Sequence, residues 1–230
     1  MKITNYIKRS HRVLLEIKET LFFDRINVYI KDSLPQNVSI NNIFKKIERL
    51  IPSGLASNID IVYVGQFKDF VERDVNAFYK DGALYISNEQ DDENDAIDDI
   101  VHEIAHATEE KYGSEIYGDD VLEREFLLKR KKLYQILKAY DYPVEYKKFM
   151  NPEYNQEFDE LLYKKIGYEK LEHFTMYLFP SNYSVTSLRE YYAIGFEHFF
   201  LGKRKELTKI SPVLYNKIAS IVEVEEEYGD

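Results

Sequence analysis

The stretch DAIDDIVHEIAHATEEKY, residues 95–112, carries the pattern from which the rest of the chain can be interpreted. Its apolar residues recur at helical spacing around much of the circumference, which predicts a largely buried helix from about Asp95 to Tyr112, ending at Gly113. These apolar positions are Ile97, Ile100, Val101, Ile104, Ala105 and Ala107. His102 and His106 lie one turn apart on one face. Histidines on so buried a helix need polar partners or a metal ion.

Residues 102–106 read His-Glu-Ile-Ala-His, an H-E-x-x-H motif. At this spacing His102 and His106 can ligate one zinc ion, and Glu103 can reach a water molecule in the open coordination position. The chain has only five histidines in 230 residues, so a chance match is rare. The motif indicates a zinc-dependent peptidase with Zn²⁺ as its cofactor.

Composition excludes several other classes of protein. Hydrophobic residues make up 44% of the chain, with 20 Tyr and 14 Phe, which is typical of a folded globular protein. The net charge of −10 argues against a nucleic-acid partner held through phosphates. The absence of cysteine excludes disulfides, cysteine-ligated zinc and a cysteine nucleophile.

No targeting or membrane segment is evident. The basic N-terminus Met1–Arg9 lacks a following apolar segment, so it does not resemble a signal peptide. No stretch approaches 18 apolar residues, which predicts no membrane span. We therefore expect a cytoplasmic protein, the alternative being a secreted one whose signal is absent from this chain or one exported by a non-standard route. The sequence does not indicate an oligomeric state.

Before residue 115 the pattern is mixed α and β. Strands are predicted at Arg25–Lys31 and Ile59–Val64, with a helix between them that begins after a Ser39 cap and ends at residues 52–54. Its apolar face comprises Ile40, Ile43, Phe44, Ile47, Leu50 and Ile51. Asp81-Gly82, between the apolar runs 75–80 and 83–87, predicts a β-hairpin. The acidic residues 89–95 suit the N-terminus of the motif helix.

After residue 115 the chain reads as almost entirely helical. Helices are expected at about 119–140, 155–166, 167–178, 186–201 and 211–223. No repeat or flexible linker interrupts this pattern. We therefore expect one α+β domain over residues 1–230, with an α/β half at about 1–114 and a helical half at about 115–230.

A catalytic zinc needs a third protein ligand, for which several residues compete. Glu190 lies near the start of a long apolar helix, and Glu197 follows two turns later on roughly the same face. His173 lies in a separate helix, and the axis of their own helix carries Glu109 and Glu110 away from a zinc ion bound at His102 and His106. From the residues alone Glu190 and Glu197 are hard to separate.

A resemblance favours Glu190. The stretch Tyr183-Ser-Val-Thr-Ser-Leu-Arg-Glu190-Tyr191-Tyr192-Ala193-Ile-Gly-Phe196 resembles a signature of the anthrax-lethal-factor-like metallopeptidases, which include the Pro-Pro endopeptidases. Two further segments are similar to the same family: His102–Glu110 and Lys205–Ile218. The resemblance covers roughly residues 60–112 and 180–222. It implies a zincin-like fold with Glu190 as third zinc ligand and Tyr183 as a catalytic hydrogen-bond donor.

Two positions depart from the family pattern. Ala105 replaces the glycine that often precedes the second histidine. Ile194 stands where lethal factor has an acidic residue four positions after the glutamate ligand, so a carboxylate supporting the ligands has to come from elsewhere, if it is present. Four carboxylates lie three or four residues from one of the two histidines and could accept a hydrogen bond from its ring: Asp98, Asp99, Glu109 and Glu110. For most of them, a solvated charge on the helix is the plainer interpretation.

The implied chemistry is peptide hydrolysis. Zinc held by His102, His106 and Glu190 would activate water, Glu103 would take the proton and pass it to the leaving amine, and Tyr183 would stabilise the oxyanion. An extended peptide would pair with an edge strand, for which residues 83–87 are the best candidate, an ordinary core strand being the alternative.

The remaining polar features are interpreted as structural. The run Lys129-Arg130-Lys131-Lys132 predicts a solvated helix face balanced by Glu123 and Glu125. His11, His173 and His198 are interpreted as structural residues.

Three hypotheses for function follow from these features. The leading one is a zinc endopeptidase acting on a peptide or protein substrate. The second is a catalytically silent zincin-fold protein that binds a protein partner through the same groove. The third is a non-peptidase metal protein, or a helical module in which the motif occurs by chance.

Overall fold

The computed structural model describes residues 20–73 and 75–228. The chain forms two compact units, one up to Glu103 and one from Ile104 onward. The boundary falls inside helix α4 (Glu93–Tyr117), so this helix belongs to both units. A small mixed sheet in the first unit and helices in the second confirm the α+β class. His11 and Met1–Arg9 lie outside the described residues.

The first unit is built on a five-stranded mixed sheet. Its strands are β1 (Thr20–Phe22), β2 (Ile26–Ile30), β3 (Ile61–Val64), β4 (Ala77–Lys80) and β5 (Ala83–Ile86). They are ordered β1-β2-β3-β5-β4, with β2, β3 and β5 parallel and the two outer strands antiparallel to their neighbours. The predicted strands at 25–31 and 59–64 are confirmed as β2 and β3, whereas β1 has no counterpart among the predictions.

The predicted hairpin is confirmed, but the predicted edge strand is wrong. Asp81 and Gly82 have φ angles of 49° and 78°, the positive values that a two-residue hairpin turn requires. Strand β5 lies between β3 and β4, so both of its edges are paired, and β4 is the edge strand on this side of the sheet. The order of strands depends on pairing with the distant β3, which the local alternation of β5 does not encode.

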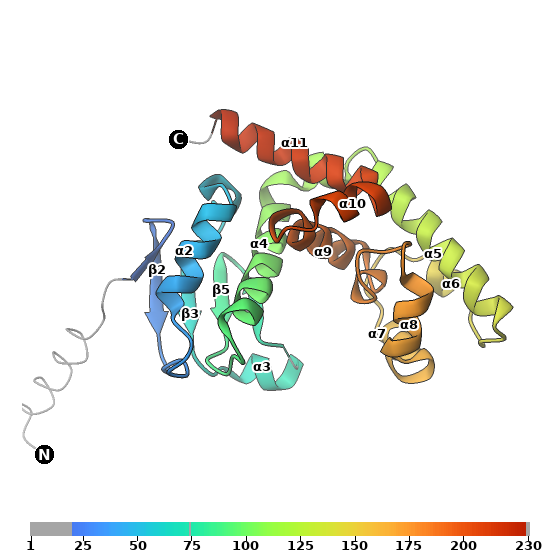
Figure 1. The fold of residues 1–230 in the computed structure, drawn as a ribbon, viewed down its shortest axis with the longest axis horizontal. Coiled ribbons are helices and arrows are strands. Elements are labelled where there is room, and N and C mark those ends of the chain that lie inside the picture. Colours follow the sequence, from blue (N-terminus) through green and yellow to red (C-terminus); the bar gives the residue numbers. More distant parts are fainter. Residues whose placement is uncertain (1–19, 74, 229–230) are drawn as a thin grey trace, which may run out of the picture. The chain divides into compact units, whose positions relative to one another are not determined.

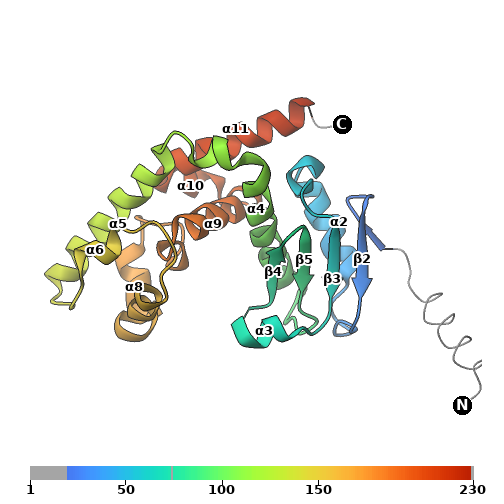
Figure 2. The ribbon, with the colours of Figure 1, turned by 180° about the vertical axis from the view of Figure 1, so that it is seen from behind.

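Helices cover one face of this sheet. They are α2 (Ile40–Leu50) and the first part of α4, while the short helix α3 (Lys68–Arg73) lies at one end; η1 (Ser53–Ala56) follows α2 (Figure 1). Figure 2, seen from behind, shows the strands in front of α2. The predicted apolar face of α2 is buried except for Leu50, which is exposed.

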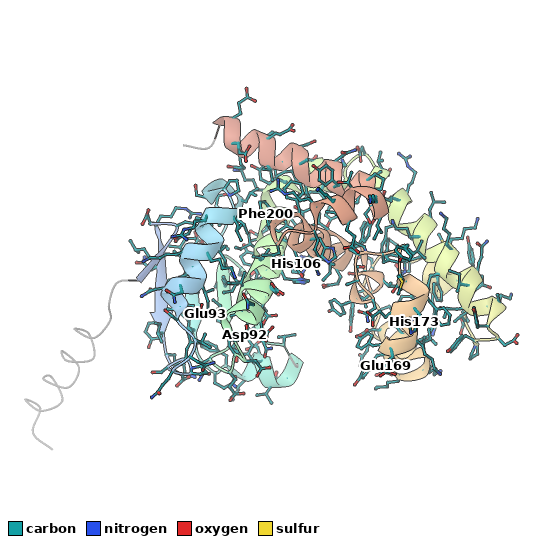
Figure 3. All side chains as sticks on the ribbon, in the orientation of Figure 1. Asp92, Glu93, His106, Glu169, His173 and Phe200 are labelled. Carbon is teal, nitrogen blue, oxygen red and sulfur yellow. The ribbon has the colours of Figure 1, made fainter. Side chains whose placement is uncertain are left out.

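The predicted Ser39 cap is correct in position and wrong in mechanism. Ser39 is the N-cap residue of α2, but its side chain makes no capping hydrogen bond. The Glu93 carboxylate, at the start of α4 (Figure 3), accepts hydrogen bonds from the backbone N–H of Ser39 at 3.1 Å and from Asn42 Nδ2 at 3.2 Å. The N-terminus of α2 is therefore satisfied by the neighbouring helix.

Helix α4 is longer than expected, because it continues through Gly113 to Tyr117. Tyr112 and Ile116 on either side of Gly113 are buried, and this burial outweighs the low helix propensity of glycine. All six apolar positions predicted for the helix are buried. At its N-terminus Asp92 Oδ1 accepts the backbone N–H groups of Asn94 and Asp95, as expected for an acidic helix start.

The second unit is helical. After the second part of α4 come α5 (Val121–Ala139), α6 (Tyr146–Phe149), α7 (Gln156–Glu160), the π-helical turn η2 (Leu161–Ile166), α8 (Tyr168–Thr175), the 3₁₀ turn η3 (Tyr183–Val185), α9 (Leu188–Phe200), α10 (Arg204–Ile210) and α11 (Pro212–Tyr228). The predicted helices are confirmed to within a few residues, apart from the π turn; α6 and α10 were not expected. No helix in the described ranges is long and apolar enough to cross a membrane.

Helix α9 is the packing centre of this unit, in contact with α5, α10 and α11. Glu125 of α5 joins three helices: it accepts a hydrogen bond from the Tyr191 hydroxyl at 2.8 Å and from the backbone N–H groups of Val213 and Leu214 at the start of α11. The prediction of a solvated basic face on α5 is wrong for Lys129 and Arg130, which are buried.

The two buried cations have partners in other segments of the second unit. Lys129 Nζ donates to the carbonyl oxygens of Leu178 and Ile210, at 2.7 and 2.5 Å. The Arg130 guanidinium donates to Asn151 O and lies over the ring of Phe158, 4.1 Å from its centroid. Acceptors and rings supplied by distant segments thus replace solvent around these side chains.

Candidate metal centre

Two histidines and one glutamate come together at helix α4. One potential ligand atom from each of His102, His106 and Glu190 lies within 4.8 Å of the others. His102 and His106 are one turn apart on α4 itself, and Glu190 approaches from the first turn of α9. His106 Nε2 lies 3.8 Å from Glu190 Oε1. Among the described residues this is the one group of three or more such side chains with that geometry.

Local structure fixes Glu190 in place. Ser187 is the N-cap residue of α9, and its Oγ accepts a hydrogen bond from the backbone N–H of Glu190 at 3.1 Å. Helix α9 is tied to α4 within the second unit by a 2.9 Å hydrogen bond between Thr108 Oγ1 and the buried Tyr192 hydroxyl. The sequence Ser187-x-x-Glu190 has the form of a capping box, a signal that the sequence analysis did not use.

The ring of His106 is oriented by Glu109. His106 Nδ1 lies 3.0 Å from Glu109 Oε2, and the same oxygen accepts hydrogen bonds from Arg189 Nε at 2.9 Å and Nη2 at 2.6 Å. Glu109 Oε1 accepts from the Tyr117 hydroxyl. Burial alone raises the pKa of the Glu109 carboxyl, but the hydrogen bonds from His106 and Arg189 outweigh it, so the pKa lies below its ordinary value.

The carboxylate of Glu103 faces the sheet edge of the first unit. Glu103 Oε2 accepts the backbone N–H of Tyr79, on edge strand β4, at 2.7 Å. Tyr79 lies opposite Leu84 of β5 in the antiparallel register. Its N–H therefore belongs to the outer strand of the sheet, and Glu103 is bound to that strand. The residue predicted to act as the general base is thus held by one charge-assisted hydrogen bond.

Tyr183 belongs to η3, a few residues before α9, and its side chain is about one-third exposed, at 38%. Burial raises the pKa of its hydroxyl, and the negative charges of Glu190 and Asp159 raise it further. The hydroxyl therefore stays protonated at neutral pH and is available as a hydrogen-bond donor.

The three clustered residues offer a set of donor atoms that could hold a metal ion. Two imidazole nitrogens and a carboxylate oxygen are a donor set that catalytic zinc sites use, leaving one position open. Zinc–ligand bonds of about 2.0–2.2 Å in a tetrahedron place ligand atoms about 3.3–3.6 Å apart. The separation of 3.8 Å between His106 Nε2 and Glu190 Oε1 is close to that value.

Other residues considered as ligands lie elsewhere. Glu197 is outside the three-residue cluster, although it is on the same helix as Glu190. His173 is exposed on α8, a helix separate from the one that carries His106 (Figure 3). His198 is buried at 7% exposure, and burial, followed by the nearby Lys203, lowers its pKa to about 4.

Sequence reasoning left Glu109 and Glu110 equivalent, and it did not consider Arg189. The structure places Glu109 against His106 and leaves Glu110 on the exposed side of the helix. Positions three and four residues after a histidine both lie near it on a helix, so spacing alone does not choose between them. The signal available in the sequence was Arg189 directly before Glu190, because it places a cation next to a candidate carboxylate ligand.

Comparison of the chain with protein-family models, with curated proteins and with solved structures finds no match.

Proposed function

We propose that this chain is a zinc-dependent endopeptidase with a zincin-like fold that hydrolyses peptide bonds in peptide or protein substrates. The observation that carries the proposal is the approach of Glu190 to His106, at 3.8 Å, beside the H-E-x-x-H helix. This approach completes the two-histidine, one-carboxylate ligand set of His102, His106 and Glu190. The resemblance of residues 183–196 to the lethal-factor-like signature supports the same assignment.

In this proposal each nearby side chain has a defined task. A zinc ion held by His102, His106 and Glu190 would act as a Lewis acid, polarising a carbonyl and lowering the pKa of water. Glu103 accepts the proton of the attacking water and delivers it to the leaving amine. The Tyr183 hydroxyl donates a hydrogen bond to the carbonyl oxygen as negative charge develops on it.

Strand β4 replaces residues 83–87 as the strand with which a substrate would pair. It is one of the two edge strands, and its Tyr79 N–H contacts Glu103 directly. A peptide added along β4 would therefore place a backbone carbonyl near the general base.

Cleavage profiling on a proteome-derived peptide library tests the proposal. The zinc-loaded protein should cleave a subset of peptides, and Glu103→Gln should lower the rate by about 100-fold or more, because general-base catalysis contributes about 10²–10⁴. Zinc content should be equal in the two proteins. Equal cleavage by Glu103→Gln would remove the site from the reaction. Zinc binding without any cleavage would favour the catalytically silent, partner-binding alternative.

A further inference from the structure

One carboxylate oxygen in the second unit serves two neighbours of the candidate metal centre. Glu109 Oε2 lies 3.0 Å from His106 Nδ1 and accepts two hydrogen bonds from Arg189, at 2.9 and 2.6 Å. The other oxygen, Oε1, accepts from the Tyr117 hydroxyl. The Glu109 side chain is only 8% exposed, so these partners, and not solvent, satisfy it.

The contact with His106 determines which ring nitrogen can bind a metal. An ionised carboxylate only accepts hydrogen bonds, so Nδ1 is the ring nitrogen of His106 that donates to Glu109, and Nε2 is the nitrogen that is left to bind a metal. Nε2 is also the nitrogen that lies 3.8 Å from Glu190 Oε1. Glu109 therefore turns the ligating nitrogen toward the third candidate ligand.

The contact with Arg189 acts on the other side of the same site. Arg189 directly precedes Glu190 in the first turn of α9. Because two donors of Arg189 converge on Glu109, the turn that carries Glu190 is fastened to α4 at the position of His106. His106 and Glu190 are thus both connected to a single group.

The exposure of Arg189 indicates what this arrangement contributes. Its side chain is 62% exposed, whereas that of Glu109 is 8% exposed, so Arg189 reaches from the protein surface to a buried carboxylate and contributes little to core packing itself. An exposed arginine whose two donors converge on a buried carboxylate beside His106 is better explained by the geometry of the site than by core packing. We propose that Glu109 is a positioning residue that aligns His106 directly and Glu190 through Arg189. This proposal rests on the proposed zinc site.

Metal binding provides a test that does not depend on activity. Zinc affinity, measured by competition with a chromophoric chelator, should fall about 10- to 100-fold in Glu109→Gln, the range typical for loss of a group that orients a ligand. Glu110→Gln is the matched control: it removes the same charge one residue later, at an exposed position, and should bind zinc as the wild type does.

Arg189→Met is a second variant, chosen because it alters an exposed side chain and leaves the buried Glu109 carboxylate in place with its contacts to His106 and Tyr117. It should weaken zinc binding as well, by a smaller factor. In the double variant, the loss of zinc-binding free energy should be smaller than the sum of the losses in the two single variants. A sub-additive result is expected because both changes act through one carboxylate.

The visible spectrum of the Co²⁺-loaded proteins separates positioning from a merely structural role. The ligand-field bands should shift in Glu109→Gln and Arg189→Met, and should be unchanged in Glu110→Gln. Wild-type affinity and spectrum in both Glu109→Gln and Arg189→Met would overturn the positioning role while leaving the proposed zinc site standing. A wild-type protein that binds neither zinc nor cobalt would overturn the zinc site, and the positioning role with it.

Discussion

Replacing Gly195 by alanine should destabilise the second unit, although alanine favours helices more than glycine does. Gly195 lies in the middle of α9, where a Cβ atom would be 2.3 Å from Leu214 Cδ2 and 2.6 Å from its Cγ. Leu214 is fully buried, so its side chain has no solvent to move into. The glycine is therefore required by the close approach of α9 and α11.

The magnitude follows from two opposing terms. Alanine gains about 1 kcal/mol of helix propensity over glycine. Overpacking a well-packed core costs about 1–3 kcal/mol, and a contact this short with a buried side chain belongs at the upper end, about 3 kcal/mol. Gly195→Ala should therefore lower the free energy of unfolding by about 2 kcal/mol. For a chain of this size that corresponds to a fall in Tm of about 4–8 °C.

Gly113→Ala is the matched control. Gly113 is also inside a helix, α4, but a Cβ there would meet no atom within 4 Å. Only the propensity term remains, so this variant should gain about 1 kcal/mol and raise Tm by about 2–4 °C. Urea and thermal unfolding followed by circular dichroism measure both variants. A Gly195→Ala protein as stable as the wild type would refute the packing argument, and a destabilised Gly113→Ala would refute the propensity argument.

Three further predictions concern the same unit. Glu125→Ala should lose about 1–3 kcal/mol in urea unfolding, because the Tyr191 hydroxyl and two backbone N–H groups of α11 lose their acceptor; no loss would contradict its linking role. The free energy of unfolding should fall by up to about 3 kcal/mol as the pH drops from about 6.5 to about 4, because His198 takes up a proton at a higher pH in the unfolded chain than in the folded one. His198→Leu should flatten this part of the stability profile, and an unaltered profile would contradict the role given to His198. Tyr183→Phe should lower kcat about 10- to 1000-fold while zinc affinity stays within about twofold, and an unchanged kcat would remove Tyr183 from the mechanism.

Features with a local cause were predictable from the sequence. The long buried helix at 95–112 follows from apolar spacing, and the hairpin follows from Asp81-Gly82, whose φ angles are both positive in the structure. The H-E-x-x-H motif likewise identified His102 and His106 as neighbours on one face.

Features that depend on distant partners were not predictable. The interior place of β5 results from pairing with β3 as well as β4. Lys129 can be buried because the carbonyl oxygens of Leu178 and Ile210 accept hydrogen bonds from its Nζ, and nothing in the basic run itself signals these partners. The residues also left Glu190 and Glu197 equal as ligands; the fold brings Glu190 to His106, through a helix start that the sequence only hints at in Ser187.

The central claim is that His102, His106 and Glu190 hold one zinc ion. The most direct measurement is the zinc content of gently purified protein, by elemental analysis, for the wild type and for Glu190→Ala and Glu197→Ala. The wild type and Glu197→Ala should contain about one zinc ion per chain, and Glu190→Ala should contain almost none. Full zinc content in Glu190→Ala, or its loss in Glu197→Ala alone, would contradict the account.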